Sequence, residues 1–137
     1  MPRYKRPTKR SKTYVPGEIW DYALRFCRCY PLWIAELSVY DTSQAIRYDK
    51  PEVQVSNNYN PTEETAIRHA KLQEQVRIVE QAAEQTCQSD TMTKILIMGV
   101  THGLSYETLD KQGIPCGRRM YYELRREMIY RVSQEIS

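Results

Sequence analysis

Basic and aromatic side chains share one face of a segment near the C-terminus that is predicted to be helical. At about 100° per residue, an arc of about 120° carries Arg118, Arg119, Tyr122, Arg125 and Arg126. Arginine forms bidentate hydrogen bonds with guanine and with phosphate. Charged faces are usually only solvated and then interleave acids, whereas here only Glu123 and Glu127 are present, at the margin of the arc. The pattern predicts a DNA-binding helix.

The position of each side chain along this helix predicts what it contacts on double-stranded DNA. Residues near the start of a recognition helix reach base edges, and those further along contact phosphates. The predicted base contacts are Arg118, Arg119 and Tyr122. The predicted phosphate contacts are Arg125, Arg126 and Lys111, together with Arg3, Lys5, Arg6, Lys9, Arg10 and Lys12. These last six lie in the first twelve residues, which hold no acid, whereas the net charge of the whole chain is only +3.

The elements that must position these side chains form a short helix, a turn and a longer helix between Ser105 and Ser137. This is the layout of a helix-turn-helix. Ser105 is expected to cap the first helix, which Leu109 anchors. Gly113 allows the positive φ that ends a helix, and Ile114 is expected to fill the small core between the two helices.

The apolar side chains of the longer helix predict which of its faces is buried. The predicted buried stripe consists of Met120, Tyr121, Leu124 and Met128. Ile129 and Tyr130 fall outside this stripe. They are free to contact the N-terminal helices, a second subunit or another protein.

Helical periodicity in every apolar segment, without alternating strand patterns, predicts an all-α fold. Pro31 is expected to end or kink the first helix. The predicted order is a disordered basic arm (1–14), an N-terminal helical segment (15–40), a polar loop (41–60), a long central helix (61–88) and a helix-turn-helix DNA-binding domain (91–137).

The central helix carries apolar residues at alternating steps of four and three, the spacing of a coiled-coil seam. The seam consists of Leu72, Val76, Val79, Ala83 and Thr86. Ile67, Ile78 and Ala82 lie beside it and make it wider than one partner helix needs. Either the helix packs only in the core of its own chain, or it also contacts a second copy in a homodimer.

Other chemistry finds little support in the sequence. Cys27, Cys29, Cys87 and Cys116 lack the spacing of a zinc site, and we expect reduced, packing cysteines, no metal and no cofactor. His69 and His102 have no nucleophile or carboxylate at a spacing that would indicate a catalytic site, so the chain is not expected to be an enzyme. No apolar run approaches the roughly 20 residues that span a bilayer, so we expect no membrane partner and a soluble, cytoplasmic protein.

The C-terminal motif resembles known DNA-binding families. Leu104–Leu109 and Gly113–Tyr122, followed by Arg125 and Arg126, resemble the region-4 helix-turn-helix of sigma factors. They are more similar still to the C-terminal part of small phage late-gene transcriptional activators of the RinA/ArpU type. Cys116 and Gly117 depart from that pattern, in which Ser and a polar helix former are more usual.

The resemblance covers residues 18–136, because Cys29–Trp33 and Asn60–Ala66 are also similar to early segments of such activators. It implies a phage or prophage regulator in the cytoplasm of a bacterial host. Such a protein binds DNA upstream of late genes and recruits the bacterial RNA polymerase.

A small terminase subunit, which packages DNA, is the alternative, because such proteins are also short, helical and carry a helix-turn-helix. In those proteins the DNA-binding part usually precedes the oligomerising part, which is the reverse of the order expected here. Native mass separates the two functions, since a dimer favours the regulator and a large ring favours the packaging protein.

Deleting residues 2–12 should leave folding intact and weaken DNA binding. Each phosphate contact contributes roughly 0.9 to the slope of log affinity against log salt concentration, so engagement of half the six cations would reduce that slope by nearly three. If the arm also enters the minor groove, specificity should fall as well. Binding across a salt series checks this, and superimposable slopes for intact and truncated protein would exclude the arm from the DNA interface.

Overall fold

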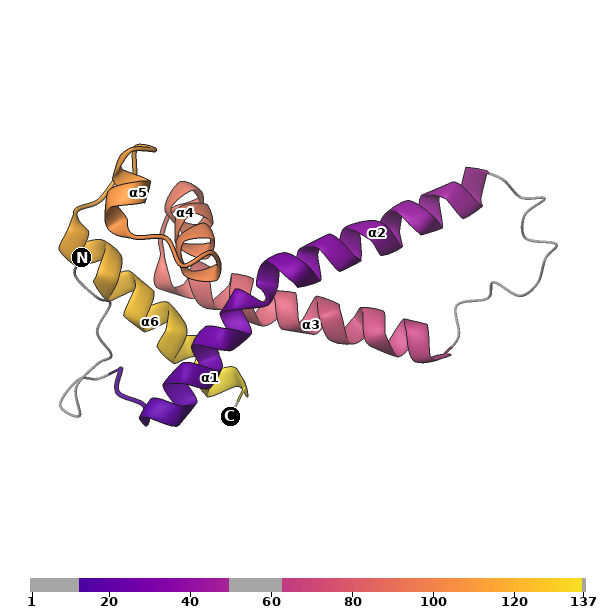
Figure 1. The fold of residues 1–137 in the computed structure, drawn as a ribbon, viewed down its shortest axis with the longest axis horizontal. Coiled ribbons are helices and arrows are strands. Elements are labelled where there is room, and N and C mark those ends of the chain that lie inside the picture. Colours follow the sequence, from indigo (N-terminus) through magenta and orange to yellow (C-terminus); the bar gives the residue numbers. More distant parts are fainter. Residues whose placement is uncertain (1–12, 50–62, 137) are drawn as a thin grey trace.

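Helices make up all the regular structure in the part of the chain that the computed structural model describes, residues 13–49 and 63–136 (Figure 1). No strand occurs in these ranges, which confirms the all-α class. The helices are α1 (Gly17–Arg28), α2 (Tyr30–Asp49), α3 (Glu63–Thr86), α4 (Asp90–Thr101), α5 (Tyr106–Asp110) and α6 (Arg118–Ile136).

The break between α1 and α2 falls where Pro31 predicts it. Pro31 lies in the first turn of α2, where its missing N–H is not needed. α2 then continues to Asp49, so the predicted loop over residues 41–60 is wrong for residues 41–49. Polar turn formers lower helix propensity by less than about 1 kcal/mol each, which is too little to end a helix already under way. Residues 50–60 lie outside the described part.

One hydrophobic core joins the N-terminal helices to the C-terminal ones. α6 packs against both α1 and α3, and α4 packs against α3. Trp20 of α1, Leu96 of α4 and Tyr121 of α6 are among the largest fully buried side chains of this core. The segment predicted as a DNA-binding domain therefore shares its core with the N-terminal helical segment.

The seam of the central helix is buried within its own chain. Leu72, Val76, Val79 and Ala83 are all less than 9% exposed. Thr86 is half-buried, and its hydroxyl donates to the carbonyl of Ala82. The core-packing role of the seam is confirmed, and these side chains offer little surface to a second copy.

The buried face of α6 is rotated by roughly a quarter turn from the predicted stripe. The buried residues are Tyr121, Arg125, Met128, Ile129, Val132 and Ser133. Met120, predicted to be buried, is 55% exposed, whereas Ile129, predicted to lie outside the stripe, is fully buried. The cause is the burial of two polar side chains, Arg125 and Ser133, which a hydrophobic pattern assigns to the surface.

The carbonyl of Leu104, in the turn between α4 and α5, holds α6 in this rotation. It accepts a hydrogen bond from the Tyr121 hydroxyl at 2.9 Å and another from Nη1 of Arg125 at 3.1 Å. Burial raises the pKa of Tyr121, so its hydroxyl remains a donor. The hydroxyl passes directly over Gly99 of α4, where a Cβ atom would collide with it.

Gly99→Ala should therefore destabilise the fold by about 1–3 kcal/mol through overpacking, although the same change in an exposed helix stabilises by about 1 kcal/mol. Urea unfolding measures the free energy of unfolding and shows whether Gly99→Ala lowers or raises it. Gly117→Ala, just before α6, is the control for adding a methyl group in open space, because a Cβ atom at Gly117 meets nothing within 4 Å. Equal stability of the Gly99→Ala variant and the wild type would contradict the close approach of Tyr121.

Candidate nucleic-acid interface

The short helix α5 and the turn after it have the local features that the sequence predicts. The Ser105 hydroxyl accepts a hydrogen bond from the N–H of Thr108 at 3.3 Å, so Ser105 caps α5 as expected. Gly113 adopts a φ of 88°, and the turn then leads Ile114 into the core, where it is 8% exposed. These features fix the path of the chain into α6.

Two arginines at the start of α6 lie at the surface. The side chain of Arg119 is 93% exposed, with its Nε 3.2 Å from Oε1 of Glu123. The side chain of Arg118 is 41% exposed and forms an ion pair with Glu107 of α5. Its guanidinium carbon also lies 5.5 Å from the centre of the Tyr122 ring.

The remaining predicted cations differ in accessibility. Lys111, in the turn after α5, is exposed, and Arg126 is half-buried. The six cations predicted in the arm, residues 3–12, lie outside the described part of the chain. Arg118, Arg119, Lys111 and Arg126 are therefore the predicted contact residues that the structure leaves accessible.

Arg125 is not a surface cation, so its predicted phosphate contact is wrong. It is only 5% exposed, and its guanidinium donates to the carbonyl of Leu104. The physical reason is the Leu104 carbonyl in the turn between α4 and α5, which gives the guanidinium an acceptor inside the protein. A guanidinium held in the core by its own chain cannot reach a phosphate without leaving that bond.

Tyr122 also contributes to packing. Its hydroxyl accepts a hydrogen bond from the N–H of Tyr106, the first residue of α5, at 3.2 Å. Its ring packs edge-on against Tyr121, with 5.0 Å between ring centres. The side chain thus holds α5 against α6, and this packing role does not favour the predicted base contact.

Two accessible side chains near this surface are not among the predicted contacts. Met120 is exposed beside Arg119, and a correct prediction of the buried face of α6 would have found it. The guanidinium of Arg28, from α1, lies against Gly103, where a Cβ atom would be 2.5 Å from its Nη2. No local signal in the sequence connects Arg28 with Gly103.

Two of the cysteines, Cys27 and Cys87, are buried, and Cys29 and Cys116 are half-buried. Burial raises the pKa of the Cys27 thiol to about 12, and it also raises the pKa values of Cys87 and Cys116. Residues 13–49 and 63–136 contain no cluster of three His, Cys, Asp or Glu side chains suited to a metal ion. Within the same ranges, no helix has the length and apolar character that crossing a bilayer requires.

Comparison with protein-family models, with curated proteins and with solved structures found no match to this chain.

Changes at Arg125 and Arg119 should separate a structural arginine from an exposed one. Arg125→Ala removes a charged donor from the Leu104 carbonyl and should destabilise the fold by about 1–3 kcal/mol. Arg119→Ala should change the free energy of unfolding by no more than about 0.5 kcal/mol, because its side chain is in water. Urea unfolding measures both, and wild-type stability of the Arg125→Ala variant would refute its role in the core.

Proposed function

We propose that the protein binds double-stranded DNA, with the start of α6 entering the major groove. The observation that supports this is the exposure of two successive arginines, Arg118 and Arg119, on a helix whose second half packs one face into the core. A recognition helix needs this combination, because it must be held rigidly while its first turns remain accessible. In this proposal α5, the turn at Gly113 and α6 form the helix-turn-helix.

Arg118 and Arg119 contact base edges in the proposed complex, as their position at the start of the helix favours. Their ion pairs with Glu107 and Glu123 are exposed, and such pairs are weak and screened by salt. DNA can therefore replace these carboxylates at little cost. Met120 offers an apolar side chain beside Arg119, a chemistry that suits the methyl group of thymine.

Lys111 and Arg126 contact phosphates on either side of the proposed base contacts. Lys111 is exposed in the turn before α6, and Arg126 lies two turns after Arg118 along the helix. Charges placed in this way fix the register of a helix on the duplex without reading sequence. Arg125 has no part in this interface.

We infer further that the protein regulates transcription in a phage or prophage and activates late genes through the host RNA polymerase. The support for this step is the resemblance of Leu104–Leu109 and Gly113–Tyr122 to late-gene activators of the RinA/ArpU type. Transcription from a promoter that carries the selected DNA site, with host polymerase present, tests activation separately from binding.

Selection of DNA from a random pool by the purified protein tests the proposed binding. One sequence should be enriched, and Arg119→Ala should then lose about 1–3 kcal/mol of preference for that sequence over unrelated DNA. Arg126→Ala should weaken binding to all sequences alike. If no sequence is enriched above the starting pool, sequence-specific recognition is wrong.

The matched control is Arg77→Ala on α3. This change removes the same charge from a half-exposed side chain outside the proposed helix-turn-helix. It should leave both the affinity and the sequence preference unchanged. An equal loss in the Arg77→Ala and Arg119→Ala variants would mean that net charge alone governs binding.

A further inference from the structure

The last residue of α1, Arg28, holds its guanidinium against the turn between α4 and α5. A Cβ atom on Gly103 would lie 2.5 Å from Nη2, 2.7 Å from Cζ and 3.0 Å from Nη1 of Arg28, so the guanidinium lies close over the backbone of this glycine. Gly103 has a φ of 65° and comes two residues before Ser105, the N-cap of α5. An N-terminal helix thus places a cation at the start of the proposed helix-turn-helix.

Arg28 is exposed, and it forms no ion pair with any residue in the described part of the chain. The proposed base contacts differ in this respect, because Arg118 pairs with Glu107 and Arg119 pairs with Glu123. A cation that is held by packing but has no carboxylate partner is available to an anion. It also loses less side-chain entropy when it binds one than a cation that moves freely.

The segments that meet at Arg28 carry no acid. α1 packs against α4, and neither residues 24–35 nor residues 91–106 contain an Asp or a Glu. Burial raises the pKa of the Cys27 thiol to about 12, and the positive charges of Arg125 and Arg28 oppose that rise, so both guanidiniums lie near this thiol. The exposed basic side chains of the two segments are Arg25, Arg28, Lys94 and His102.

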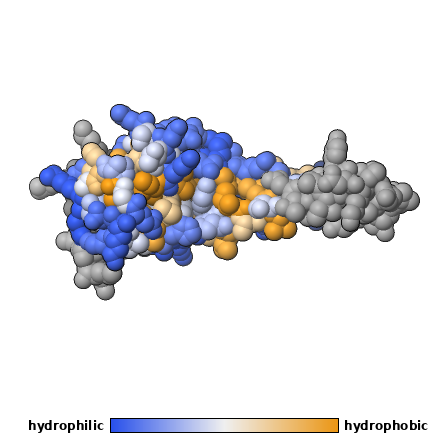
Figure 2. All heavy atoms as spheres, turned by 90° about the horizontal axis from the view of Figure 1, so that it is seen from above, coloured by the Kyte–Doolittle hydropathy of each residue, from blue (hydrophilic) through white to orange (hydrophobic). Residues whose placement is uncertain are grey.

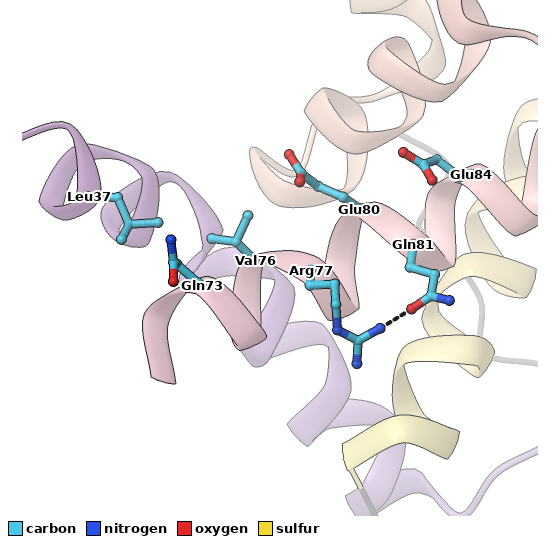
Figure 3. Close-up of a pocket in the computed structure, with 7 residues that line it drawn as sticks. All are labelled: Leu37, Gln73, Val76, Arg77, Glu80, Gln81 and Glu84. Atoms are coloured by element: carbon cyan, nitrogen blue, oxygen red, sulfur yellow. Dashed lines mark hydrogen bonds between the residues drawn. The ribbon is translucent and has the colours of Figure 1, made fainter. Parts of the chain in front are cut away.

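The hairpin of α2 and α3 has a surface of a different character. Figure 2 shows apolar atoms over the part of the molecule where α2 lies. A groove between α2 and α3 is lined by Leu37, Gln73, Val76, Arg77, Glu80, Gln81 and Glu84 (Figure 3). The arginine of this groove already pairs with Glu74, and its two glutamates repel an anion. The contact between α1 and the turn before α5 is therefore better suited to a phosphate than the hairpin is.

We propose that Arg28 contacts a phosphate of the DNA whose bases the start of α6 reads, which rests on the DNA binding proposed above. In a helix-turn-helix the first helix crosses the phosphate backbone while the second lies in the major groove. The first helix here is α5, and Arg28 lies at the turn that leads into it. α1, which is outside the helix-turn-helix, thereby becomes part of the DNA interface.

The dimensions of the site agree with this contact. Glu107, whose carboxylate pairs with Arg118, follows Gly103 by four residues. The two Cα atoms are therefore at most about 14 Å apart, and the major groove is about 12 Å wide. With Arg118 in the groove, Arg28 is within reach of the backbone that borders it. The guanidinium can form bidentate hydrogen bonds with a phosphate there.

The salt dependence of DNA binding by the full chain tests this contact. The probes are a duplex that carries the sequence enriched by selection and a duplex of unrelated sequence. Arg28→Ala should weaken binding to both alike, and the slope of log affinity against log salt concentration should fall by roughly 0.9. The advantage of the wild type should then shrink about threefold between about 50 and 200 mM salt. Arg28→Lys keeps the charge and should keep the slope.

Arg77→Ala is the matched control, because it removes the same charge from the hairpin, and its slope should equal that of the wild type. Arg28→Ala should also leave the urea midpoint close to that of the wild type, because the side chain is exposed. A shifted midpoint with an unchanged slope would mean that Arg28 serves only to pack on Gly103.

A wild-type slope in the Arg28→Ala variant overturns the phosphate contact. An equal fall in the Arg77→Ala variant does so too, as does a loss confined to the enriched sequence. The unrelated duplex tests the contact even where selection enriches no sequence, so failure of sequence-specific recognition and failure of this contact are separate results. A wild type that binds neither duplex overturns the proposed DNA binding and the Arg28 contact together.

Discussion

The carbonyl oxygen of Leu104 accepts two hydrogen bonds, from the hydroxyl of Tyr121 and from the guanidinium of Arg125, and this contact sets the rotation of α6. A hydrogen bond to a charged group contributes about 1.5–3 kcal/mol, more than a neutral one. The contact depends on Gly99, because only a residue without a Cβ atom lets the Tyr121 hydroxyl pass. The burial of Arg125 and the exposure of Met120 follow from this rotation.

With its rotation fixed, α6 performs two tasks along its length. Its second half contributes Met128, Ile129 and Val132 to the core shared with α1 and α3. Its first turns carry Arg118 and Arg119 at the surface. The proposed recognition surface is therefore held in place by a helix that is also part of the core. Substitutions in the core are expected to alter the positions of these surface arginines.

The hairpin of α2 and α3 extends away from the end of the molecule that carries α5 and the start of α6 (Figure 1). The start of α6 therefore lies at the opposite end of the molecule from the far end of this hairpin.

The local features of this chain follow from the sequence because each depends on residues within one or two turns. Pro31 marks the break between α1 and α2, Ser105 caps α5, and Gly113 supplies the positive φ before Ile114 enters the core. The apolar seam of α3 follows from spacing alone in the same way. Helical periodicity thus predicts the all-α class and most of the helix positions.

The tertiary structure alone decided which face of α6 is buried. The sequence pattern predicts Arg125 at the surface, but the Leu104 carbonyl accepts its hydrogen bond and allows it to be buried. This acceptor lies 21 residues earlier in the chain, beyond the reach of a local pattern. The placement of Arg28 against Gly103 and the exposure of Met120 depend on the same long-range packing. A hydrophobic pattern reports only the polarity of each side chain. The burial of a polar side chain depends in addition on whether a distant group satisfies its hydrogen bonds.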